Sequence, residues 1–195
     1  MPDYPYAKAA GYLEMFRGLG APVARELADV RIPVPDVTYD GTHELDLGGR
    51  TVQLRPTGRA HSKGDQVVTV PDAGLLLAGD LVEAGQFAIF PWFPPHDVDV
   101  SGVRWIDVLD RLISERPRVV VPGHGAVGDS KLLTEVRDYL TELRDETWRR
   151  RDSKLPEATI AAEIHDLMIR RHSDWRLPEW IDRGVACLCA EYPAD

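Results

Sequence analysis

The chain has 195 residues, of which 44% are hydrophobic and 28% are charged, a composition typical of a globular protein. Its formal net charge of −9 argues against a non-specific nucleic-acid surface and against an anionic membrane as partners. No stretch approaches the ~18 consecutive apolar residues of a membrane-spanning helix, and the first residues lack the basic region and apolar core of a secretory signal.

The first part of the chain predicts short helices followed by strands. Residues 5–30 carry apolar side chains at helical spacing around the turn-forming segment GLGAP, which predicts two short helices or one broken helix. Residues 43–47 alternate, and Gly48-Gly49 predicts a hairpin to 51–56. Two further apolar runs, 66–71 and 75–80, follow, and the second is continuous enough to predict a strand covered on both faces.

A loop rich in proline and large apolar residues spans positions 87–100. One interpretation makes it a wall of a hydrophobic substrate pocket, with Trp92, Phe93 and His96 as substrate-binding candidates. The other interpretation has the loop pack over the C-terminal helices. The sequence does not decide between them.

The remaining chain is predicted to be mostly helical. Ser101 is a candidate N-cap for a helix that stops before Pro117, and a short strand follows at 118–121. Ser130 is a candidate N-cap for a long helix that ends in a solvated run of arginines, 149–151. The last segment is also helical, and it carries three features that we interpret as structural: His165 and His172 on a solvated helix face, and the cysteines Cys187 and Cys189 as unbridged thiols in a reducing cytoplasm.

Three strand-like runs each end in a loop that presents one candidate metal ligand. His61 follows the run 51–60, Asp80 ends the run 75–80, and His124 follows the run 118–121. Loops at strand ends can gather ligands that are distant in the sequence. Two imidazoles and a carboxylate suit zinc, and they also suit iron or manganese.

The segments around these residues resemble the C-terminal half of the metallo-β-lactamase superfamily. The resemblance lies in AHSKGDQVVTVPDAGLLLAGDLV and PRVVVPGHG and spans roughly residues 40–145. It implies that His61 is a ligand of a first metal, that Asp80 bridges two metals, and that His124 binds the second. It also implies an α/β fold of the αββα-sandwich type. We expect residues 1–150 to form the metallo-β-lactamase-like domain and 151–195 a helical extension packed on it.

The family signature His-x-His-x-Asp-His has no match in this chain. The only histidine before His61 is His43, in the middle of an alternating strand. We therefore expect the chain to begin partway through the family fold and to bind metal weakly, because two protein ligands per metal are too few. Lys63, another departure, is either a contact for an anionic substrate group or a solvated loop residue.

The resemblance implies a metal-dependent hydrolase. Metal-bound hydroxide would attack the ester, lactone, thioester or amide carbonyl of a small-molecule substrate. An alternative is a non-catalytic relative that keeps the scaffold without a complete metal site. A third hypothesis is assembly, in which an exposed sheet edge or apolar face pairs with a second copy or with a partner chain that completes the site.

Overall fold

The structure, a computed structural model, describes residues 4–33 and 35–193. The chain divides into two units, Met1–Tyr39 and Asp40–Asp195, which are described separately below. No helix within the described residues is both long enough and apolar enough to cross a membrane.

The first unit contains two short helices, α1 (Tyr4–Arg17) and α2 (Ala21–Glu26). Gly20, with φ of 139°, lies at the turn between them, so the predicted pair of helices is confirmed. A pair of short helices is too small to enclose a core of its own. Several of its apolar side chains are accordingly exposed, among them Tyr12, Met15, Phe16 and Leu19.

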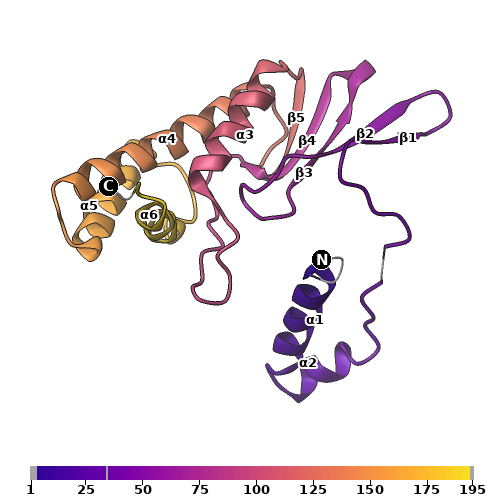
Figure 1. Cartoon of the computed structure of the whole chain (residues 1–195), viewed down its shortest axis with the longest axis horizontal. Coiled ribbons are helices and arrows are strands. Elements are labelled where there is room, and N and C mark those ends of the chain that lie inside the picture. The colour runs from indigo at the N-terminus through magenta and orange to yellow at the C-terminus, as the bar shows by residue number, and fades with distance from the viewer. Residues whose placement is uncertain (1–3, 34, 194–195) are drawn as a thin grey trace. The chain divides into compact units, whose positions relative to one another are not determined.

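The second unit is built on one mixed five-stranded sheet in the order β1-β2-β3-β4-β5 (Figure 1). Neighbouring strands run antiparallel except β4 and β5, which are parallel. The predicted hairpin is present, and both Gly48 and Gly49 have positive φ at its turn. The strands are β1 (His43–Asp46), β2 (Thr51–Pro56), β3 (Gln66–Val70), β4 (Leu75–Glu83) and β5 (Val119–His124).

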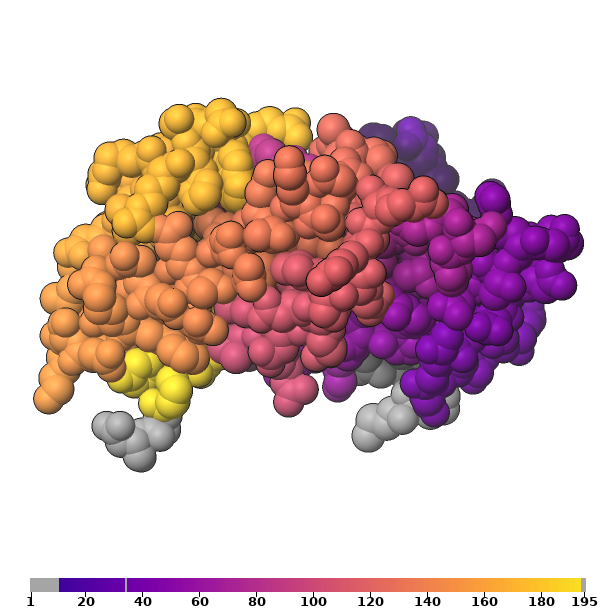
Figure 2. Space-filling model, turned by 90° about the horizontal axis from the view of Figure 1, so that it is seen from above, coloured from indigo at the N-terminus to yellow at the C-terminus, as the bar shows by residue number. Residues whose placement is uncertain are grey.

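Four helices complete this unit and confirm the predicted α/β class. They are α3 (Gly102–Ser114), α4 (Lys131–Asp152), α5 (Glu157–Arg171) and α6 (Trp180–Ala190), and a 3₁₀ turn, Pro71–Ala73, precedes β4. The amphipathic face of α3 buries Trp105, Ile106, Leu109 and Leu112. Figure 2 shows the C-terminal helices at one end of this unit and the strands β1 and β2 at the other.

The two faces of the sheet differ in how they are covered. Leu76 and Val120 are paired across β4 and β5, and both are buried in the core with the helices. The opposite face is also apolar, but α3 and α4 do not cover it: Leu45 on β1 is 40% exposed and Val119 on β5 is 37% exposed. The register places Leu45, Val52, Leu54, Val68, Val70, Leu75, Leu77, Val119 and Val121 together on this second face. The expectation that residues 75–80 are covered on both faces is therefore wrong within the described residues.

Of three local expectations about the helices, one is confirmed and two need correction. Ser101 does cap α3, because its hydroxyl accepts a hydrogen bond from Arg104 N, but Ser130 makes no such bond at α4. There the carboxylate of Asp129 accepts from Lys131 N at 2.8 Å instead. Among the arginines that end α4, Arg150 is buried rather than solvated, since it bonds Glu163 on α5.

The C-terminal segment packs tightly on α4. His172 is not on a solvated face: its ring lies among Phe87, Tyr139 and Trp175. Cys187 and Cys189 are buried free thiols, as predicted. Burial raises the pKa of Cys187 to about 12 and that of Cys189 to about 11. The proposed boundary at residue 150 lies inside α4, which continues to Asp152.

Candidate metal centre

Asp80 and His124 meet where the parallel strands β4 and β5 end. The Nε2 atom of His124 lies 3.5 Å from Oδ1 of Asp80, and the two side chains are 48% and 46% exposed. A parallel pair brings its carboxyl ends to the same sheet edge, which is where α/β folds place ligand sites. Asp80 lies inside β4 and His124 is the last residue of β5, rather than in loops after the strands, and the fold brings their side chains together.

The close approach of the two strands depends on a glycine. A Cβ atom at Gly123 would lie 2.7 Å from the backbone carbon of Gly79 and closer still to Oδ1 of Asp80. No side chain fits at position 123 without displacing Asp80. The glycine before His124 therefore sets the distance between the carboxylate and the imidazole.

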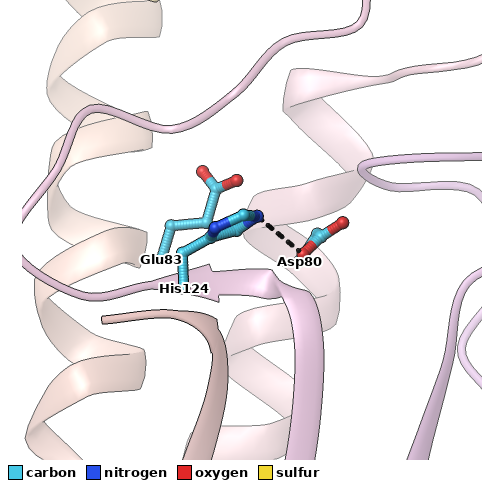
Figure 3. A group of neighbouring side chains, drawn as sticks. All are labelled: Asp80, Glu83 and His124. Atoms are coloured by element: carbon cyan, nitrogen blue, oxygen red, sulfur yellow. Dashed lines mark ion pairs between the residues drawn. The ribbon is translucent and has the colours of Figure 1, made fainter. Parts of the chain in front are cut away.

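Glu83 is the third member of this group and was missed in the sequence. Asp80, Glu83 and His124 each offer one ligand atom, and these atoms lie within 4.8 Å of one another (Figure 3). Glu83 is only 1% exposed. Burial raises the pKa of its carboxyl group to about 8, against the effect of a hydrogen bond from Ile89 N. An acidic residue directly after Leu81 and Val82 was the signal available in the sequence.

His61 lies beside this group without being a member of it. Its ring packs edge-on against Trp105, with the ring centroids 5.4 Å apart. Burial lowers the pKa of His61, while the charges of Asp65 and Asp80 oppose that shift and His124 adds to it. His61 is thus near enough to Asp80 and His124 for their charges to affect its pKa.

The loop that carries His61 is held in place by hydrogen bonds. The backbone N–H and hydroxyl of Ser62 both donate to the carboxylate of Asp65, whose pKa is raised by burial. Ser101 N donates to Ala60 O at 2.7 Å, which ties the loop to the start of α3. Lys63 is exposed on this loop.

The substrate-binding candidates in the loop 87–100 contact α6. The ring of Phe93 lies edge-on to Trp180, and the guanidinium of Arg183 stacks 4.7 Å from its centroid. Arg183 also donates to the carbonyl of Trp92. His96 is exposed in the tight turn that follows. These contacts favour the interpretation in which the loop packs over the C-terminal helices.

The chemistry of the donor set fits a divalent cation. Carboxylate oxygen and imidazole nitrogen are common ligands of zinc, iron and manganese. One oxygen of the buried Glu83 carboxylate, Oε1, has no hydrogen-bond partner among the described residues. Such an orphaned oxygen is costly unless a cation or another donor satisfies it.

Comparison with known proteins places this arrangement in a family. The model of the metallo-beta-lactamase superfamily matches residues 2–124. A curated relative, metallo-beta-lactamase type 2 of Bacteroides fragilis, is 26% identical over 118 residues, which are 60% of this chain and 46% of the relative. The chain thus spans about half the length of the curated relative it matches.

Solved structures give similar matches. A metallo-beta-lactamase from Pontibacter korlensis is 28% identical, covers 63% of this chain and 55% of that chain, and has a TM-score of 0.49. The enzyme TMB-1 is 20% identical, covers 56% of this chain and 49% of its own, and has a TM-score of 0.47. Because the family model matches more than half of the residues, the chain belongs to the metallo-beta-lactamase superfamily.

Proposed function

We propose that this chain provides the second half of a metal-dependent hydrolase site that acts on an ester, lactone, thioester or amide carbonyl of a small molecule. The observation that carries this proposal is the approach of His124 Nε2 to Asp80 Oδ1 at the ends of β4 and β5. Membership of the superfamily supports it. Zinc is the cation we favour, with iron or manganese as the other candidates for this donor set.

The proposed role of each residue follows from its position. Asp80 and His124 would hold the cation, and His61, on the adjoining loop, would be a ligand of a second one. A divalent cation, when bound, supplies Lewis acidity and activates water for attack on a carbonyl. We also propose that Lys63 on the His61 loop contacts substrate, and that Trp92, Phe93 and His96 do so with the parts of their side chains that do not pack on α6.

The test is hydrolysis by the zinc-loaded chain of chromogenic esters, lactones, thioesters and amides. Asp80→Asn and His124→Ala should each reduce turnover to background. His165→Ala is the matched control, because His165 also pairs with an aspartate, Asp182, at 3.0 Å on the distant helices α5 and α6. Turnover that survives both site variants would rule out this assignment.

A specific observation also favours the assembly hypothesis, and we propose that a second copy of the chain covers the open sheet face. The face has no acidic or basic side chain except His43, so two copies meet without charge repulsion. Five strands about 4.8 Å apart and about five residues long give a patch of roughly 24 by 17 Å, or about 400 Å² on each copy. Two copies would bury about 800 Å² in total, below the roughly 1,200 Å² of stable interfaces, so we expect only a weak, concentration-dependent dimer.

The native mass at increasing protein concentration tests the dimer. Leu45→Lys should keep the chain monomeric, because it places a charge on the open face. Glu44→Lys on the same strand points to the opposite face and should leave association unchanged. A wild-type chain that stays monomeric at every concentration would exclude a second copy as the cover of this face. The non-catalytic alternative is tested separately, by the absence of turnover.

We propose a cytoplasmic location on the basis of the two buried free thiols, Cys187 and Cys189. We also propose that neither nucleic acid nor membrane is a partner, because the net charge of −9 opposes both. Cell fractionation checks the location.

A further inference from the structure

We propose that Glu83 is a protein ligand of the cation, so that Asp80, Glu83 and His124 hold one divalent metal ion without His61. This inference rests on the proposed function, because it names the ligands of the same site. It differs from the sequence-based ligand set, which paired Asp80 and His124 with His61 and left each metal with two protein ligands.

The strand geometry gives the first argument. Residues 80 and 83 are an odd number of positions apart, so in a regular strand their side chains would point to opposite faces. The pairing of β4 with β5 is irregular here: Gly79 pairs with Pro122, and Glu83 pairs with His124. Four steps along β4 therefore match two steps along β5. Such a bulge re-aims side chains, and here it brings Asp80 and Glu83 to the same imidazole (Figure 3).

The state of the Glu83 carboxylate gives the second argument. Its side chain is 1% exposed, and its Oε2 atom accepts a hydrogen bond from Ile89 N at 2.6 Å. Its Oε1 atom has no partner among the described residues. A buried carboxylate with one satisfied oxygen is poised to donate the lone pairs of the other to a cation.

Two other buried polar groups are also unpaired among the described residues. The hydroxyl of Tyr139 is fully buried and electrostatically linked to Glu83, yet it too has no hydrogen-bond partner in the part of the chain that the structure describes. The side-chain amide of Gln86 is also buried with its Nε2 atom unpaired. An internal hydrogen-bond network among the described residues therefore does not explain why Glu83 Oε1 is buried. The ligand atoms of Asp80, Glu83 and His124, by contrast, lie within 4.8 Å of one another.

The experiment measures Zn²⁺ binding to the full chain after chelator treatment, by competition with a chromophoric chelator. Glu83→Gln keeps the size of the side chain and an oxygen that accepts from Ile89 N, but it cannot become the carboxylate that would bind a cation. We expect Zn²⁺ affinity to fall by about 100-fold or more, the upper end of the effect of losing a supporting partner of a ligand. His61→Ala should leave the affinity for the first equivalent of Zn²⁺ within about 2-fold, because His61 is assigned to a second cation and not to this one. Glu135→Gln, an exposed change on α4, is the matched control.

Visible absorption of the Co²⁺-loaded chain supplies a readout independent of activity. Loss of a ligand changes the intensity and position of the cobalt bands, so with one equivalent of Co²⁺ bound, Glu83→Gln should differ from wild type and His61→Ala should not. Unchanged affinity and unchanged bands in Glu83→Gln would overturn the proposal, as would a wild-type chain that binds no zinc. If Glu83→Gln does not fold, Glu83→Leu takes its place, because leucine is of similar size and offers no ligand atom, and unchanged binding there has the same meaning.

The two proposals fail in distinguishable ways. Zinc binding that depends on Glu83 without any hydrolysis supports the ligand assignment and removes the hydrolase function. Hydrolysis that depends on Asp80 and His124, together with a zinc affinity that Glu83→Gln does not change, supports the hydrolase function and removes Glu83 from the ligand set.

Discussion

The indole of Trp105 joins the two halves of the candidate site: its ring lies edge-on to His61, with centroids 5.4 Å apart, and its Nε1 donates to Leu81 O at 3.0 Å. One buried side chain on α3 thus contacts the His61 loop and also fixes the backbone next to Asp80. The position of both candidate ligands depends on the packing of a helix that supplies no ligand itself.

Replacing Trp105 tests whether its packing supports the zinc site. Trp105→Phe removes the indole hydrogen bond and part of the buried volume, so we expect a loss of about 1–3 kcal/mol in the free energy of unfolding. Zinc affinity should fall as well. Trp148→Phe removes a comparable bond, from Trp148 Nε1 to Leu188 O at 3.0 Å, far from the site. Zinc affinity and urea unfolding are measured for both variants. Equal effects of the two variants on zinc affinity would contradict a specific role of Trp105 in supporting the site.

The glycine before His124 offers a steric test. Gly123→Ala places a Cβ 2.7 Å from the backbone of Gly79, so β4 and β5 must separate and Asp80 must move. We expect a loss of about 1–3 kcal/mol in stability, typical of overpacking, together with weaker zinc binding. Gly64→Ala meets no atom within 4 Å and should change neither. Thermal unfolding with and without zinc measures both effects.

His172 gives the protein a pH dependence in stability. Burial lowers the pKa of His172 from its ordinary value of 6.5, so the folded state holds fewer protons than the unfolded state in the range below 6.5. Stability is then present above pH 6.5 and is lost as the pH falls through the lowered folded pKa. His172→Gln removes the titrating group and should flatten the slope of unfolding free energy in this range. A slope identical to wild type would show that other groups produce it.

The ion pairs at the end of α4 predict contrasting effects of two neighbouring arginines. Arg150 is 10% exposed and bonds both Glu146 and Glu163, so it joins α4 to α5. Arg150→Ala should cost about 1–3 kcal/mol, because partly buried charges lose their partner. Arg149, 63% exposed, pairs only within its own helix in the structure described, and Arg149→Ala should cost about 0–1 kcal/mol. Equilibrium urea unfolding of the two variants gives the comparison.

Much of the fold could be predicted from local patterns in the sequence. Alternation at 43–47 and the Gly48-Gly49 pair correctly predicted the first hairpin, and Ser101 correctly marked the start of α3. These features depend on residues close together in the chain, where turn chemistry and capping act. The covering of residues 75–80 was predicted wrongly, because an apolar run shows that a strand can be buried and not which neighbour buries it.

The candidate site shows the same division between sequence and tertiary structure. The sequence by itself determined the family and the order of His61, Asp80 and His124 along the chain, because those properties reside in short motifs. Only the tertiary structure decided that Glu83 joins Asp80 and His124. The physical reason is the irregular pairing of β4 with β5: strand alternation predicts opposite faces for residues 80 and 83, and a bulge between two strands cannot be deduced from either strand alone.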